Sequence, residues 1–322
     1  MSLLQSNIPG AAASHDRGRK TERGHHIRVF IAAAASFIFL AAIGIYGASY
    51  YMLPLDQRPY SEKHELLKPS GSIGLKLGVL GTVLFFIIFL YALRKVIPWL
   101  GRWGTARHWM DFHVIAGISA PVVIAFHASF KFQGIAGFAF WIMLAVALSG
   151  IVGRYLYSQI PRSLTAAELS LNEWRNSELE PDGVLLAQST FSREQLQSAL
   201  RVPGKEHIRH IGPLRAVGEM ITLDLGLPFR AARLRRVTCG FGGQLISIGG
   251  LFSTGNEEVE QIIRVVRKNV QLSKRVLFLD QTQRVFHLWH VIHRPFSYAF
   301  AILAIIHIVV VSGLGFISFG LR

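Results

Sequence analysis

Cysteine is almost absent from this sequence, because Cys239 is the only one among 322 residues. A single thiol excludes an internal disulfide, a C-x-x-C-H attachment site for c-type haem and an iron–sulfur cluster held by cysteines. Acidic residues are also few, with 19 Asp and Glu against 34 Lys and Arg, and the formal net charge is +15. A nucleic-acid partner is one interpretation of this charge balance.

Long apolar runs are what the chain has in quantity. Its residues are 51% hydrophobic and its mean hydropathy is +0.37, which is typical of a membrane protein. Five runs are long enough to cross a hydrocarbon core of about 30 Å. They cover residues 29–50, 77–93, 112–130, 132–153 and 295–321, the last entered from about Val285. The first run is longer than the apolar part of a signal peptide, so it predicts an uncleaved helix.

The distribution of basic residues predicts the orientation. The N-terminal segment, the 94–107 connection and the segment after Arg154 are basic, whereas the 51–72 connection has balanced charge. Basic connections stay on the cytoplasmic side. We therefore expect an integral protein of a bacterial inner membrane, with a cytoplasmic N-terminus and a periplasmic C-terminus. Basic loops at an anionic membrane surface explain the net charge without a nucleic-acid partner.

These features divide the chain into four parts: a disordered basic tail (1–27), four transmembrane helices (28–157), a cytoplasmic insertion (158–284) and a fifth helix (285–322). Within the insertion, the patterns predict helices near 166–180, 192–201 and 257–275. The Gly- and Pro-punctuated stretch 203–255 favours short strands. The predicted fold class is thus an all-α membrane protein, a five-helix transmembrane bundle with a mixed insertion between helices four and five.

Two of the apolar runs carry a matched pair of histidines. His127 follows His113 by fourteen positions, and His307 follows His293 by the same interval. On a helix, fourteen residues come within about 40° of four whole turns and rise roughly 21 Å. The third and fifth helices are expected to run in the same direction. His113 then pairs in depth with His293 near the inner edge, and His127 pairs with His307 nearer the outer side.

A lone histidine on an apolar segment is more often a core residue than a ligand. Ionisable residues inside a membrane are costly, however, and one spacing repeated on two segments favours a shared function. Imidazole nitrogen suits iron, so the pattern predicts that His113, His127, His293 and His307 are the axial ligands of two haem irons. Without cysteine pairs both haems must be held non-covalently, as b-type haem.

Further polar residues lie at the predicted membrane edges. Arg154, Arg294 and Lys131 have two interpretations, charge-assisted bonds to haem propionates or snorkelling to lipid headgroups. His287 and His290 suit proton transfer, propionate contact or a quinone pocket, or are interfacial residues with no ligand. The basic run 230–236 is typical of a solvated or lipid-facing surface, and docking of an acidic redox partner is the alternative.

The paired histidines occur together with two further motifs, WHVIHRPFSY at 289–298 and SGIVGRYLYSQIPR at 149–162. With these features the chain resembles the di-haem membrane cytochromes b, a group that includes ferric-reductase-like and respiratory b-type cytochromes. The resemblance covers the five helices, a little over half of the chain, and not the insertion. It implies transmembrane electron transfer, with a quinone or a separate redox protein such as a cytochrome c or an iron–sulfur or flavin subunit as partner. Unlike full ferric reductases, the chain has no recognisable flavin or nicotinamide domain.

The main hypothesis is therefore the cytochrome b subunit of an oxidoreductase complex, holding two haem b in a lipid environment. One alternative is a proton-coupled transporter with intramembrane histidines as relays. The lack of carboxylates in the third and fifth apolar runs and of an inverted repeat counts against it. Another alternative is a membrane anchor for the insertion.

Overall fold

The computed structural model describes residues 9–160, 191, 198–199, 201–238 and 257–315, and every regular element in these ranges is a helix. The chain divides into two compact units, residues 1–152 with 292–322, and residues 153–291. Helices α6 and α14 each continue from one unit into the other. The fold class predicted from the sequence, an all-helical protein with five long apolar helices, is confirmed.

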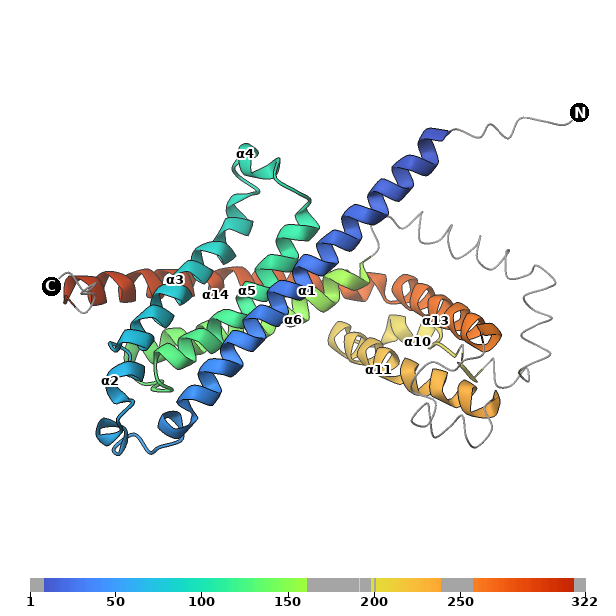
Figure 1. The fold of residues 1–322 in the computed structure, drawn as a ribbon. Helices are drawn as coiled ribbons and strands as arrows, with labels where there is room; N and C mark the ends of the chain where they lie inside the picture. The colour runs from blue at the N-terminus through green and yellow to red at the C-terminus, as the bar shows by residue number, and fades with distance from the viewer. Residues whose placement is uncertain (1–8, 161–190, 192–197, 200, 239–256, 316–322) are drawn as a thin grey trace, which may run out of the picture. The chain divides into compact units, whose positions relative to one another are not determined.

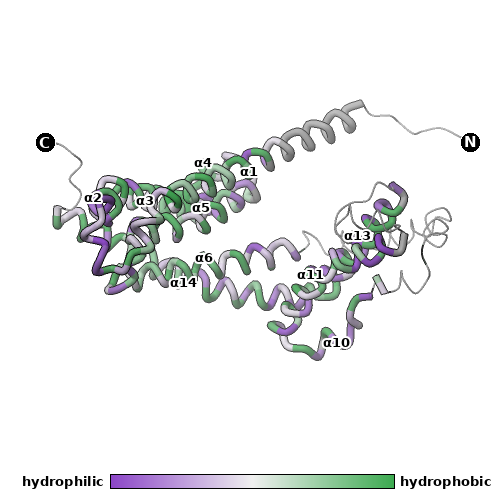
Figure 2. The backbone as a smooth tube through the Cα atoms, turned by 60° about the horizontal axis from the view of Figure 1, so that its bottom comes forward, coloured by the Kyte–Doolittle hydropathy of each residue, from purple (hydrophilic) through white to green (hydrophobic). Residues whose placement is uncertain are grey.

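The five apolar helices belong mainly to the first unit (Figure 1). They are α1 (Pro9–Tyr51), α3 (Ser72–Leu93), α5 (Ala106–His127), α6 (Gly134–Gln159) and α14 (Leu279–Gly313). Short helices lie in the connections: η1 (Arg58–Tyr60), α2 (His64–Leu67) and α4 (Pro98–Gly101). Figure 2 shows apolar residues along most of the five long helices. Their length and composition identify an integral membrane protein.

The first helix differs from the prediction at its N-terminal end. Residues 1–27 were expected to be disordered, but α1 begins at Pro9 and continues without a break into the apolar span Ile27–Tyr51. Helix propagation costs far less than nucleation, so a long apolar helix can extend into an adjoining polar segment. Residues 1–8 lie outside the described residues.

Helices α3 and α5 pack most closely in the first unit, with backbones within 8 Å of each other along much of their length. Glycines on α3 allow this approach: a Cβ atom at Gly81 would lie 2.2 Å from Cδ1 of Ile124, and one at Gly78 would lie 2.7 Å from Cε1 of His127. Among the described residues, no comparably close backbone approach links α14 to another apolar helix. Contacts between α14 and the α3–α5 pair are therefore made by side chains and not by closely packed backbones.

A buried arginine fixes the turn that follows α5. Arg58 is 6% exposed, and its guanidinium donates to the backbone carbonyls of Leu53 (3.0 Å), Tyr51 (2.8 Å) and Ser129. Ser129 and Phe130 adopt left-handed backbone conformations, with φ of 48° and 58°. Carbonyl oxygens thus satisfy a buried charge, and the bonds hold the end of α5 next to the 51–72 connection.

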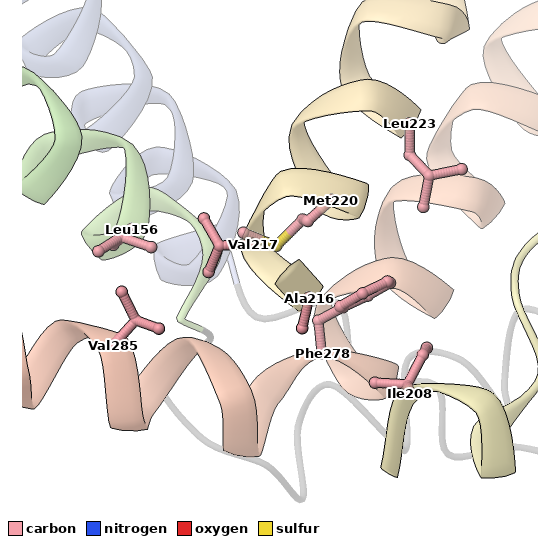
Figure 3. Close-up of a cluster of buried hydrophobic side chains, with 8 residues drawn as sticks. All are labelled: Leu156, Ile208, Ala216, Val217, Met220, Leu223, Phe278 and Val285. Carbon is pink, nitrogen blue, oxygen red and sulfur yellow. The ribbon is translucent and has the colours of Figure 1, made fainter. Parts of the chain in front are cut away.

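The second unit contains α10 (Lys205–His210), α11 (Pro213–Thr238), α13 (Glu257–Leu277) and the adjoining ends of α6 and α14. Figure 3 shows eight buried side chains that form its core. They are Leu156, Ile208, Ala216, Val217, Met220, Leu223, Phe278 and Val285. The helix predicted at 257–275 is confirmed, whereas the strands favoured for 203–255 are absent from 205–210 and 213–238, which are helical. The helix predicted at 166–180 and most of that at 192–201 lie outside the described residues.

A buried ion pair lies within this second unit. The ammonium of Lys274 on α13 donates to Asp224 on α11, and the Tyr155 hydroxyl on α6 donates to the other carboxylate oxygen at 2.7 Å. The Lys274 side chain is only 2% exposed. Burial lowers the pKa of Lys274, and the Asp224 carboxylate opposes that shift. One carboxylate thus holds three helices together at a single point.

Candidate functional site

Two of the predicted ligands lie on the wall of one cavity. His127 from α5 and His307 from α14 both line a cavity of about 300 Å³ enclosed by α3, α5, α6 and α14. Small residues form much of its wall: Gly78, Gly81, Ala120, Ala136, Ala139 and Ala304. Small side chains allow a flat ring to approach the helix backbone closely. The cavity therefore offers imidazoles from two helices across a space with mostly apolar walls.

The His127 ring is oriented by a hydrogen bond to the neighbouring helix. Its Nδ1 lies 2.8 Å from the carbonyl oxygen of Gly74, near the start of α3. A carbonyl oxygen only accepts, so Nδ1 carries the hydrogen, and Nε2 of the neutral ring has a free lone pair. Metal-bound histidines almost always make such a second bond, which fixes the tautomer and raises the basicity of the ligating nitrogen.

His113 shows the same arrangement two turns from the start of its helix. Its Nδ1 donates to the carbonyl oxygen of Ile88 at 3.0 Å, again on α3. His113 also lines a second cavity of about 390 Å³, together with residues at the α3–α5 end: Ile87, Leu90, Trp103, Gly104, His108, Trp109 and Phe112. Both predicted ligands on α5 are thus anchored to the backbone of the same neighbour, which itself supplies none of the four histidines.

His293 is anchored by a side chain instead of a carbonyl group. The Ser149 hydroxyl on α6 donates to the carbonyl oxygen of Val146 at 2.8 Å, and it lies 2.7 Å from Nδ1 of His293. Since the hydroxyl hydrogen is used, its oxygen accepts from Nδ1, which orients the His293 ring. Gly150 lies beside the ring, where a Cβ atom would be 3.9 Å from Cε1.

The contacts also give the relative direction of the helices. Gly74 and Ile88 contact His127 and His113, so α3 runs antiparallel to α5. His127 and His307, each near the C-terminal end of its helix, share a cavity, as expected if α5 and α14 run in the same direction. No described cavity contains both His113 and His293. The structure therefore brings His127 and His307 together around one cavity. For His113 and His293 it shows hydrogen bonds that orient each ring, but no shared cavity among the described residues.

The donor set restricts which metal centre the residues fit. Among the residues that the structure describes, no group of three or more His, Cys, Asp or Glu side chains is placed to hold a metal ion. A bare zinc ion takes three or four protein ligands, whereas a haem iron needs only two axial ligands from the protein. Paired imidazoles beside an apolar cavity thus fit haem better than a bare metal ion.

The other predicted site residues have different environments. Lys131 lines the cavity of His127 and His307, where it could meet an anionic group. Arg294 is exposed on α14, and Arg154 belongs to the second unit. His287 is exposed, while Nδ1 of His290 lies 3.0 Å from the carbonyl oxygen of Phe286.

One cluster is absent from the sequence-based predictions. Nε2 of His25 on α1 lies 3.0 Å from an Asp111 carboxylate oxygen, and the His25 ring stacks on His108 with centroids 3.6 Å apart. Assigning residues 1–27 to a disordered tail concealed this cluster. Asp111 follows the basic 94–107 connection. An acidic residue next to this basic segment was the only sequence feature that pointed to the cluster.

Comparison of the chain with protein-family models, with curated proteins and with solved structures found no match. Function is therefore argued from the site itself.

Proposed function

We propose that this protein carries electrons across a membrane through two b-type haems, held by His113 with His293 and by His127 with His307. One observation carries the proposal: His127 and His307, matched in spacing with the other pair, face one apolar cavity, and the His127 ring is already anchored through Nδ1. When bound, each haem supplies a one-electron ferric–ferrous couple.

The residues of the chain perform the remaining tasks. Carbonyl oxygens of Gly74 and Ile88 and the Ser149 hydroxyl fix the orientation of three imidazoles through Nδ1. The apolar wall excludes water, which favours the less charged state of a buried centre. Two imidazoles would hold each haem, and a haem held by two histidines would supply electron transfer and not oxygen chemistry.

The orientation of the protein in the membrane is inferred from its loops. Basic connections favour a cytoplasmic N-terminus and a periplasmic C-terminus, and in that orientation the His113–His293 pair lies nearer the cytoplasm. A mobile quinone or a separate redox protein, such as a cytochrome c or an iron–sulfur or flavin subunit, exchanges electrons at the two ends. In this role the chain is the cytochrome b subunit of an oxidoreductase complex.

A difference spectrum tests the proposal directly. The protein is purified from haem-replete cells, and the dithionite-reduced spectrum is compared with the air-oxidised one. A low-spin b-type α-band is expected, with two haems per chain in a pyridine haemochrome assay. A preparation without that band would support the transporter or the anchor interpretation instead.

Substitution of Gly78 tests the geometry of the His127–His307 pair. In Gly78→Ala the new Cβ would lie 2.7 Å from Cε1 and 2.8 Å from Nδ1 of His127, so the ring must move away from the Gly74 carbonyl. Haem content is expected to fall from two towards one per chain. Gly44→Ala is the matched control, because its Cβ makes an ordinary 3.5 Å contact with Phe126. Equal haem content and identical spectra in the two variants would contradict the assignment.

A further inference from the structure

Helix α11 presents a second apolar face that nothing in the described structure covers. Its first apolar face packs in the second unit, where Met220, Leu223, Leu227 and Leu234 are at most 8% exposed. On another side of the helix, Leu214 is 76% exposed, Leu225 is 65% exposed and Phe229 is 67% exposed. Ile221, 39% exposed, lies between them. We call Leu214, Ile221, Leu225 and Phe229 the outer stripe.

The outer stripe is continuous on the helix surface. Its members are separated by seven, four and four positions, so at 100° per residue they lie within an arc of about 80°. Met220, Leu223 and Leu227 lie roughly opposite on the same helical projection. A helix at the surface of a soluble unit has one apolar face, which packs against the core. A helix with a second apolar face therefore needs a second apolar environment to cover that face.

The charges beside the outer stripe are positive. Arg215 and Arg233 are exposed on the same helix, about 40° from the edge of the outer stripe. The nearby acidic groups are engaged elsewhere: Glu219 pairs with His207 at 3.2 Å, and Asp224 pairs with Lys274. An apolar stripe flanked by arginines is the pattern of a helix that lies in a membrane interface, with its apolar side in the acyl region and its cations at anionic headgroups.

We propose that α11 lies in the membrane–water interface, with the outer stripe inserted in lipid and these two arginines at anionic headgroups. Covalent continuity supports lipid as the occupant, because α6 and α14 both run from an apolar span directly into this unit. A second protein copy fits less well. A stable protein interface uses about 20–30 residues from each side, and the outer stripe offers only four. The proposal does not depend on the haems.

The single cysteine makes the test direct. Leu225→Cys is introduced into a Cys239→Ser chain, labelled with an environment-sensitive dye and reconstituted as the full protein in vesicles. The vesicles are phosphatidylcholine with or without phosphatidylglycerol, each prepared with and without nitroxide-labelled lipid. Lys268→Cys in the same background is the matched control, because Lys268 is exposed on α13 outside the outer stripe.

The dye at position 225 is expected to be quenched several-fold more strongly by the nitroxide lipid than the dye at position 268. Phosphatidylglycerol should increase that quenching, and Arg215→Gln with Arg233→Gln should abolish the increase. Equal quenching at the two positions would overturn the proposal. A blue-shifted dye at position 225 without nitroxide quenching would also overturn it, because the outer stripe would then be covered by protein.

Discussion

Haem content is expected to fall from two to one per chain when either His127 or His307 is replaced by alanine. The two residues line the same cavity from α5 and α14, so under the proposed ligation each variant would leave one haem with a single histidine while the other pair is intact. His113→Ala or His293→Ala is expected to remove the other haem. The pyridine haemochrome assay counts the haems, and low-temperature spectra of the remaining α-band identify which one is lost.

Two controls separate loss of a ligand from loss of the fold. His290→Ala should retain two haems, because His290 belongs to neither pair and bonds to the Phe286 carbonyl within its own helix. In His307→Gly, imidazole added to the buffer should restore the second haem, which a misfolded protein would not allow. Four ligand variants that all keep two haems would exclude the proposed ligation.

Asp224→Ala is expected to cause the largest loss of stability in the second unit. The substitution leaves the ammonium of Lys274 buried without its carboxylate and also removes the acceptor of the Tyr155 hydroxyl. Breaking a buried pair from one side costs about 3–5 kcal/mol, and the lower figure applies here because the Asp224 side chain is 27% exposed. Thermal unfolding of the full chain, followed by limited proteolysis of the insertion, measures the change.

The loss should depend on pH in a defined direction. Burial lowers the pKa of Lys274 below its ordinary 10.5, and without Asp224 the opposing effect is gone. The unfolded chain then binds this proton more tightly than the folded chain does. The destabilisation is therefore complete below the lowered pKa and diminishes as the pH rises towards 10.5. Glu219→Ala, which breaks a surface pair with His207, should change stability by no more than about 0.5 kcal/mol.

The five apolar helices could be predicted from the sequence because hydropathy is a local property. The spacing of the four histidines could also be read directly, since helix geometry converts fourteen positions into a depth. Their anchors could not be predicted in the same way. The acceptors at Gly74 and Ile88 are backbone carbonyls, and residue type says nothing about which carbonyl a distant ring will meet. The packing of α3 against α5 determines which carbonyl each ring meets.

The helices at 205–210 and 213–238 were not predicted, for a different reason. Gly and Pro in 203–255 were interpreted as turns between strands, but Pro213 is the first residue of α11 and Gly218, Gly226 and Pro228 lie within that helix. Proline is well suited to a first helical position, because the hydrogen-bond donor that it lacks has no partner there. Packing of α11 against α13 offsets the low helix propensity of the internal glycines.

The attachment of two imidazoles to α3 has a consequence for biosynthesis. Gly74, Ile88, His113 and His127 all belong to the first 127 residues, so one side of each proposed iron site can form as soon as the α3–α5 hairpin is made. His307 is 180 positions beyond His127. At roughly 5–20 residues per second the ribosome needs about 10–40 s to reach it. During that interval, under the proposed haem ligation, the nascent chain would present one oriented imidazole of each site to a macrocycle arriving from the bilayer.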